Sequence, residues 1–279
     1  MGLATTPRQL IDGTTIPAIG IGTSTEGEAG VLEVLSALQQ GYRLIDTAVN
    51  YGNEVEVGEA IRRSGIPRDE IVVTSKIPGR HHAYDDAIAS TKESLERMKL
   101  DRIDVHLIHW PNPRQGKYGE TWRALVQLRD DGLVRSPGVS NFTEEHLRTV
   151  IADTGVTPVL NQIELHPYFP QDDMRRVHDE LGIVTESWSP FGRSADVFKE
   201  EPVQVAAAAH GVTPGQAVVR WHLQVGALPI PRSKSPERQA NNLDVDRFEL
   251  TDDEMSAIAG LAKADGRWFG GDPDTHEEM

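Results

Sequence analysis

The chain has 279 residues, no cysteine and a formal net charge of −15 at neutral pH. The absence of cysteine excludes disulfides, thiolate metal ligands and cysteine nucleophiles, and the negative charge argues against nucleic acid or an anionic membrane as the main partner. No apolar run is long enough to span a membrane, and residues 1–9 lack an apolar signal core. We therefore expect a cytoplasmic protein, and a monomer, that binds small molecules.

Apolar runs of strand length alternate along the chain with longer segments of helical periodicity. A hairpin is expected over residues 9–16, with Asp12-Gly13 at its turn, and a first strand over residues 19–22. The later strands are expected to end near Asp46, Lys76, His109, Ser140, Gln162, Trp188 and Ile230. The helices between them are expected over residues 31–40, 54–64, 84–98, 121–131, 143–153, 172–181 and 214–224.

This alternation predicts an α/β fold with a parallel sheet and right-handed crossovers. Eight β/α units favour closure into a (β/α)8 TIM barrel, for which about 250 residues are typical. The hairpin is expected to close the bottom of the barrel. We predict a single domain over residues 1–279, in which residues 272–279 form an acidic tail exposed to solvent.

Four ionisable side chains of different types lie at or just after the ends of successive early strands: Asp46, Tyr51, Lys76 and His109. In a (β/α)8 barrel the chemistry takes place at the C-terminal ends of the strands. Because side chains alternate between the two faces of a strand, His109 shares a face with Leu107 and is expected to project into the barrel mouth. The same alternation places Asp46 and Lys76 there, and Tyr51 reaches them from its loop.

The charges of these residues suggest a role for each. Asp46 is expected to keep a buried Lys76 charged, and Lys76 to lower the pKa of Tyr51 from its ordinary value of about 10. Tyr51 would then act as a general acid toward a carbonyl oxygen that His109 orients. This set suits the addition of hydride to a carbonyl group. From residue types and spacing alone, a purely structural role is supported about equally well.

Seen together, the motifs of this chain resemble those of the aldo-keto reductase family, from residue 9 to about residue 265. The matching motifs are Asp46-Thr47-Ala48, Tyr51-Gly52-Asn53-Glu54, Thr74-Ser75-Lys76, His109-Trp110-Pro111, Gly138-Val139-Ser140-Asn141-Phe142, Asn161-Gln162-Ile163-Glu164-Leu165-His166-Pro167-Tyr168 and Ile230-Pro231-Arg232-Ser233. The chain resembles the shorter prokaryotic members, which include diketogluconate reductases and general carbonyl reductases. The resemblance implies a (β/α)8 oxidoreductase that reduces aldehydes and ketones with NADPH. It also implies Tyr51 as the proton donor, supported by Lys76, Asp46 and His109.

The resemblance further implies that the cofactor lies extended across the barrel mouth. The implied cofactor-binding residues are Gly22, Thr23, Ser140, Asn141, Gln162, Trp188, Ser189, Pro190, Gly192, Ile230, Arg232, Ser233, Arg238 and Asn242. Within this set Trp188 is the aromatic residue that stacks on the nicotinamide, although packing in the core would explain it equally well. Arg232, Ser233 and Arg238 are the ligands of the adenosine 2′-phosphate, in a basic cluster that opens a helix.

The candidate substrate-pocket residues are Val49, Asn50, Trp110 and Trp268, a set that suits compact aldehydes, dicarbonyls or keto sugars. Residues 266–271 form either a mobile flap or an anchored end of the chain. No spacing of carboxylates and histidines suggests a metal site. Two other functions stay open: a Schiff-base aldolase that uses Lys76, which a neighbouring Asp46 argues against, and a cofactor-sensing or structural barrel without significant turnover.

Overall fold

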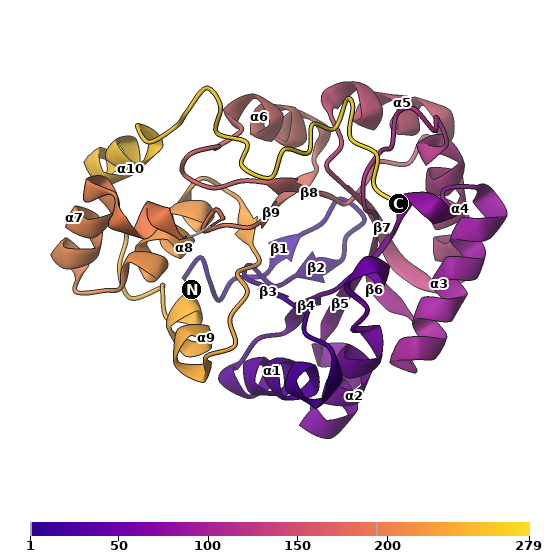
Figure 1. The fold of residues 1–279 in the computed structure, drawn as a ribbon, viewed down its shortest axis with the longest axis horizontal. Coiled ribbons are helices and arrows are strands. Elements are labelled where there is room, and N and C mark those ends of the chain that lie inside the picture. Colours follow the sequence, from indigo (N-terminus) through magenta and orange to yellow (C-terminus); the bar gives the residue numbers. More distant parts are fainter. Residues whose placement is uncertain (1, 194) are drawn as a thin grey trace.

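The computed structural model describes residues 2–193 and 195–279 and contains an eight-stranded parallel sheet, in which each strand pairs with the next along the chain. Its strands are β3 (Ile21–Gly22), β4 (Leu44–Asp46), β5 (Val72–Ile77), β6 (Ile103–Ile108), β7 (Val134–Ser140), β8 (Leu160–Glu164), β9 (Val184–Trp188) and β10 (Leu228–Pro229). The first and last strands meet through hydrogen bonds from Gly20 N to Pro229 O (3.0 Å) and from Gly22 N to Pro231 O (3.3 Å). The sheet is therefore closed into the predicted (β/α)8 barrel (Figure 1).

Helices surround the barrel (Figure 1), and all seven that the sequence predicts are present. They are α1 (Gly27–Gln40), α2 (Glu54–Ser64), α3 (Tyr84–Met98), α4 (Tyr118–Asp130), α5 (Glu144–Thr154), α6 (Asp172–Leu181), α7 (Glu201–His210), α8 (Pro214–Gln224), α9 (Pro236–Leu243) and α10 (Asp252–Ala259). Short 3-10 turns lie at Val49–Tyr51, Arg68–Glu70, Gly79–His81 and Asp196–Lys199. The sequence did not predict α7, because its alanine-rich run has no clear apolar stripe. Among the described residues, no helix is long and apolar enough to cross a membrane.

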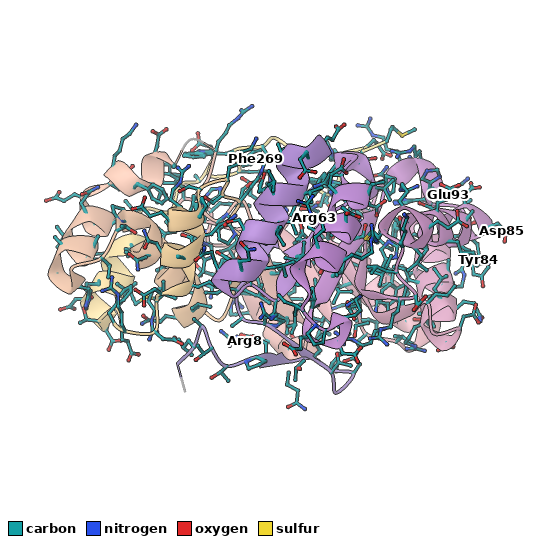
Figure 2. The ribbon with its side chains drawn as sticks, turned by 90° about the horizontal axis from the view of Figure 1, so that it is seen from below. Arg8, Arg63, Tyr84, Asp85, Glu93 and Phe269 are labelled. Atoms are coloured by element: carbon teal, nitrogen blue, oxygen red, sulfur yellow. The ribbon has the colours of Figure 1, made fainter. Side chains whose placement is uncertain are left out.

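The N-terminal hairpin consists of β1 (Arg8–Gln9) and β2 (Thr15–Ile16), which pair antiparallel. At its turn Gly13 adopts a φ of 84°, a left-handed conformation that glycine adopts without strain. Two hairpin side chains, Leu10 and Ile16, are buried in the same apolar cluster as the barrel-interior residues Leu44 and Leu107. Figure 2 shows Arg8 of the hairpin and Phe269 of the C-terminal part at opposite ends of the barrel. The hairpin therefore closes the bottom, as predicted.

The alternation of side chains along the strands decides what reaches the barrel mouth. Leu44, Val72 and Leu107 point into the barrel, whereas Ile45 and Val73 pack outward against the helices. Burying each such apolar side chain contributes about 1.5–3 kcal/mol, and a register slip of one residue would reverse every face. The barrel core therefore also fixes which polar side chains project upward from its strand ends.

Candidate active site

A buried ion pair lies at the base of the barrel mouth. Lys76, on β5, is fully buried, and its Nζ donates to Asp46 Oδ1 (2.7 Å), Asp46 Oδ2 (2.8 Å) and the carbonyl oxygen of Thr47 (2.9 Å). Burial alone would lower the pKa of Lys76, but Asp46, Tyr51 and Glu186 raise it above the ordinary value of a lysine. Lys76 therefore carries its positive charge, as the sequence predicted.

Tyr51 lies above this pair, at the end of the 3-10 turn Val49–Tyr51. Its hydroxyl is 3.4 Å from Lys76 Nζ, and its ring meets the His109 ring edge-on with 5.8 Å between the centroids. Burial raises the pKa of Tyr51; Lys76 lowers it, while Asp46 and Glu278 raise it further. The expectation that Lys76 brings the pKa of Tyr51 below its ordinary value is thus wrong for this structure, because burial outweighs the lysine.

His109 follows the last residue of β6, and its backbone is held on both sides. Its amide donates to Ile77 O (3.0 Å), and its carbonyl oxygen accepts from Asn141 Nδ2 (3.0 Å). The ring lies beside Tyr51, as predicted, whereas His106 is fully buried on the opposite face of the strand. Burial and the nearby Lys76 lower the pKa of His106 to about 3, so His106 is neutral and takes no part in the site.

One buried carboxyl group beneath the site, that of Glu186 on β9, was not predicted from the sequence. The side-chain amide of Gln162 donates to both Asp46 Oδ2 (2.8 Å) and Glu186 Oε2 (2.7 Å). Burial and the charge of Asp46 raise the pKa of Glu186 to about 8, against the opposing effects of Gln162 and Lys76. The signal was available, because Glu186 lies two residues before Trp188 and so must share its inward face.

A cavity of about 450 Å³ opens above these groups. It is lined by Gly22, Thr23, Ser24, Asp46, Tyr51, His109, Trp110, Ser140, Asn141, Gln162, Trp188, Ser189, Pro190, Phe191, Gly192, Ile230 and Arg232. On its wall Trp188 Nε1 donates to Asn141 Oδ1 (2.8 Å), and Ser140 Oγ donates to Gln162 O (2.8 Å). Asn141 and Ser189 adopt φ values of 61° and 49°, left-handed conformations that often occur at functional sites. The structure thus brings together, around one cavity, residues that the sequence predicts to be catalytic and residues that it predicts to bind the nicotinamide end of the cofactor.

A second cavity of about 700 Å³ continues from the first and shares Phe191 and Arg232 with it. Its lining includes three more of the predicted cofactor-binding residues, Ser233, Arg238 and Asn242, together with Asn241. Helix α9 begins here, and its N-cap Ser235 accepts from Arg238 N (3.4 Å). A helix N-terminus with two arginines fits a phosphate group. The two cavities together fit an extended dinucleotide that carries a 2′-phosphate.

Three of the predicted substrate residues lie outside the lining of these two cavities. Val49 precedes Tyr51 in the turn, and Asn50 is exposed and contacts the acidic tail. Trp268 packs instead on Tyr168, with 4.7 Å between the ring centroids. Its neighbour Phe269 meets Trp188 edge-on at 5.1 Å. Both aromatic side chains of this segment therefore pack against residues of the barrel.

The acidic tail is where the structure departs most from expectation. It was expected to be exposed to solvent, but it folds back over the barrel mouth, where its Glu278 Oε1 lies 2.8 Å from His109 Nδ1. The ring of His276 lies on Trp110, with 4.3 Å between the centroids. Hydrogen bonds to the Glu278 carboxylate from Asn50 and Gly79, and the contact between the rings of His276 and Trp110, favour this position over solvent. Residue types alone gave no indication of it.

The fold and the site define an enzyme of the aldo-keto reductase class, and comparison with known proteins agrees. The Aldo/keto reductase family model matches residues 18–263. The 2,5-diketo-D-gluconic acid reductase B of a Corynebacterium species is 54% identical over 97% of each chain. An aldo-keto reductase of Mycolicibacterium smegmatis is 45% identical over 95% of this chain and 96% of its own.

Solved structures are similar over the same length. The crystal structure of Gox0644 as apoform has a TM-score of 0.92 at 43% identity, over 98% of this chain and 99% of that chain. A mutant of Gox0644 in complex with NADPH has a TM-score of 0.93 at the same identity and coverage. The chain belongs to the aldo/keto reductase family and is an NADP-dependent oxidoreductase that acts on carbonyl groups. Within residues 2–193 and 195–279, no cluster of three or more His, Asp or Glu side chains is arranged to hold a metal ion.

Proposed function

We propose that this protein reduces compact carbonyl compounds to alcohols with NADPH, and that Tyr51 donates the proton. The observation that carries the proposal is the position of the Tyr51 hydroxyl, 3.4 Å from the charged Lys76, on the wall of the cavity that Trp188 and Gln162 also line. NADPH, when bound, supplies the hydride.

The residues around the carbonyl would act as follows. Its oxygen accepts hydrogen bonds from Tyr51 and His109 and, as it gains negative charge, takes the hydroxyl proton of Tyr51. The raised pKa keeps Tyr51 protonated at neutral pH before reaction, and the positive Lys76 stabilises the phenolate that is left afterwards. Asp46 keeps Lys76 charged and in place. General acid catalysis of this kind contributes about 10²–10⁴-fold in rate.

The cofactor would be held by residues whose donors and acceptors suit it. Both amide hydrogens of Gln162 are donated to carboxyl groups, which leaves its side-chain oxygen free to accept from a carboxamide. Arg232 is partly engaged, since its Nη2 donates to Thr25 Oγ1 (2.9 Å) and its Nε lies 3.5 Å from Glu33 Oε1. Arg238 is exposed at the start of α9, where a 2′-phosphate could reach it.

The substrate class follows from the size of the site and from its relatives. The substrate would share this cavity of about 450 Å³ with part of the cofactor, and Trp110 lies on its wall, so the space that is left suits compact substrates. A relative at 54% identity carries the name 2,5-diketo-D-gluconic acid reductase B. We infer that dicarbonyls and keto sugars, sugar acids included, are substrates.

The aldolase alternative is disfavoured, because the Lys76 amine is fully buried and bonded to both oxygens of Asp46. An imine requires a neutral amine that is open to the substrate.

The test is to follow NADPH consumption with a neutral dicarbonyl, a keto sugar and a diketo sugar acid, with NADH in parallel. The proposal expects turnover with NADPH for at least one of these compounds. Binding of NADPH without turnover of any of them would favour the cofactor-sensing alternative instead.

A further inference from the structure

The acidic tail (residues 272–279) is attached to the barrel mouth by specific contacts. Figure 1 shows the C-terminal segment running past β8 and β7 to end beside α4. Asn112 binds the backbone of Glu278 in both directions: its side-chain amide donates to Glu278 O, and its Oδ1 accepts from Glu278 N (3.2 Å). Arg114 N donates to Glu277 Oε1 (2.7 Å), and Asn50 Nδ2 to Met279 O (3.1 Å). These bonds hold the last residues of the tail in one register.

The register places the Glu278 carboxylate in a set of hydrogen-bond donors. Oε1 lies 2.8 Å from His109 Nδ1 and also accepts from Asn50 Nδ2, while Oε2 accepts from Gly79 N (3.3 Å). Burial would raise the pKa of Glu278, but its contacts with His109, Gly79 and Asn50 lower it below the ordinary value. Glu278 is therefore a carboxylate anion at neutral pH.

Positive charge lies beside this position. A cavity of about 420 Å³ is lined by the basic residues Arg80, Arg114 and Lys117 and by the acidic residues Asp86 and Glu277, with Met279 at the end of the tail beside them. The chain as a whole carries a net charge of −15. Three basic side chains lie here against two acidic ones, and one of the acidic residues belongs to the tail itself, so the site attracts anions locally once the tail has moved away.

The position of Glu278 conflicts with substrate binding. His109 and Tyr51 are the groups that receive the carbonyl oxygen in the proposed function, and the carboxylate is in contact with His109 and close enough to Tyr51 to raise its pKa. A substrate that sets its carbonyl oxygen beside Tyr51 and His109 and carries a carboxylate at the position of Glu278 therefore competes with Glu278. The donors that Glu278 leaves, on Asn50 and Gly79, then become available to another part of the substrate.

We propose that Asn50 and the Gly79 amide form a carboxylate-binding subsite beside His109, which Glu278 of the same chain fills until the carboxylate of an anionic carbonyl substrate replaces it. This inference rests on the proposed carbonyl reduction. The tail is then an intramolecular competitor, and keto acids are preferred over their neutral analogues. If the tail is closed nine-tenths of the time, the apparent affinity for substrate falls roughly tenfold.

The first test uses Glu278→Gln and a truncation that removes residues 272–279. KM and kcat are measured with NADPH for a keto acid and for its amide. Both variants are expected to lower KM for the keto acid by roughly three- to tenfold, with kcat nearly unchanged. Asp274→Asn is the matched control, because it removes the same charge from an exposed position in the same segment, and its KM should equal that of the wild type.

The second test measures whether the subsite prefers a carboxylate to a neutral group. In the truncated enzyme the keto acid should have a lower KM than the amide, and Asn50→Ala in that background should reduce this preference. An unchanged or raised KM in Glu278→Gln and in the truncation would overturn the competitor role. Equal KM values for acid and amide in the truncated enzyme would overturn the subsite.

A binding measurement separates this inference from the proposed function. A peptide of residues 272–279 is titrated calorimetrically into the truncated protein. It should bind with a one-to-one stoichiometry, while a peptide with Gln in place of Glu278 binds at least roughly tenfold more weakly. Absence of peptide binding would overturn the inference even if carbonyl turnover is present, whereas binding without any turnover would count against the proposed function only.

Discussion

Replacing Asp46 with asparagine tests how strongly the site depends on its buried ion pair. Lys76 is fully buried and donates to both Asp46 oxygens, at 2.7 and 2.8 Å, and to Thr47 O, at 2.9 Å. Removing one partner of a buried pair typically costs about 3–5 kcal/mol. We expect Asp46→Asn to lower the free energy of unfolding by about 3 kcal/mol, at the lower end of this range. Thr47 O and Glu186 stay close to the amine in the variant, and Lys76 can release its proton.

The assay is urea unfolding at neutral pH, in which the midpoint should fall while the slope is unchanged. Glu59→Gln is the control: it breaks the exposed pair between Glu59 and Arg62 (2.9 Å), which should cost less than about 1 kcal/mol. The cost of Asp46→Asn should shrink at alkaline pH, where Lys76 becomes neutral without penalty. A cost at neutral pH no greater than that of Glu59→Gln would refute the view that Asp46 holds a charged Lys76.

Three further variants test separate parts of the structure. Burial raises the pKa of Glu186 in the folded protein to about 8 from its ordinary value of 4.5. The free energy of unfolding of the wild type should therefore fall relative to that of Glu186→Gln as pH rises from 4.5 to 8. A difference between the two proteins that stays constant across this range, measured by urea unfolding, would contradict the assignment. Arg238→Ala should weaken the binding of NADPH roughly tenfold or more and leave the affinity for NADH nearly unchanged, as measured by fluorescence titration. Equal losses of affinity for the two cofactors would exclude a 2′-phosphate contact. Gly138→Ala should destabilise the barrel by about 1–3 kcal/mol, since its Cβ would lie 2.7 Å from Leu107 Cδ2 and 3.1 Å from Leu160 O, and an unchanged thermal midpoint would contradict this.

Much of the site was predictable because it depends on strand alternation and barrel topology. The pattern around Leu44, Val72 and Leu107 decides which side chains face inward, and the ends of parallel strands necessarily meet at one mouth. Asp46 and Lys76 therefore followed from the sequence as an ion pair.

The remaining features could not be predicted, because local sequence patterns do not show how deeply a side chain is buried or which distant residues it contacts. Whether the pKa of Tyr51 is raised or lowered depends on the balance between its burial and the charge of Lys76. The sequence indicates the nearby Lys76 but not the extent of burial. The contact between Glu278 and His109 joins residues far apart in the chain. Helix α7 was missed because alanine-rich sequence gives little periodic contrast.

The most direct test of the proposed mechanism is Tyr51→Phe, which removes the hydroxyl and keeps the ring beside His109. NADPH binding is measured by fluorescence titration, and turnover by NADPH consumption with the best carbonyl substrate. We predict that turnover falls by about 10²–10⁴-fold while the Kd for NADPH stays within roughly twofold, because the hydroxyl serves the carbonyl oxygen and not the cofactor. Turnover close to that of the wild type would contradict the assignment of Tyr51 as the proton donor.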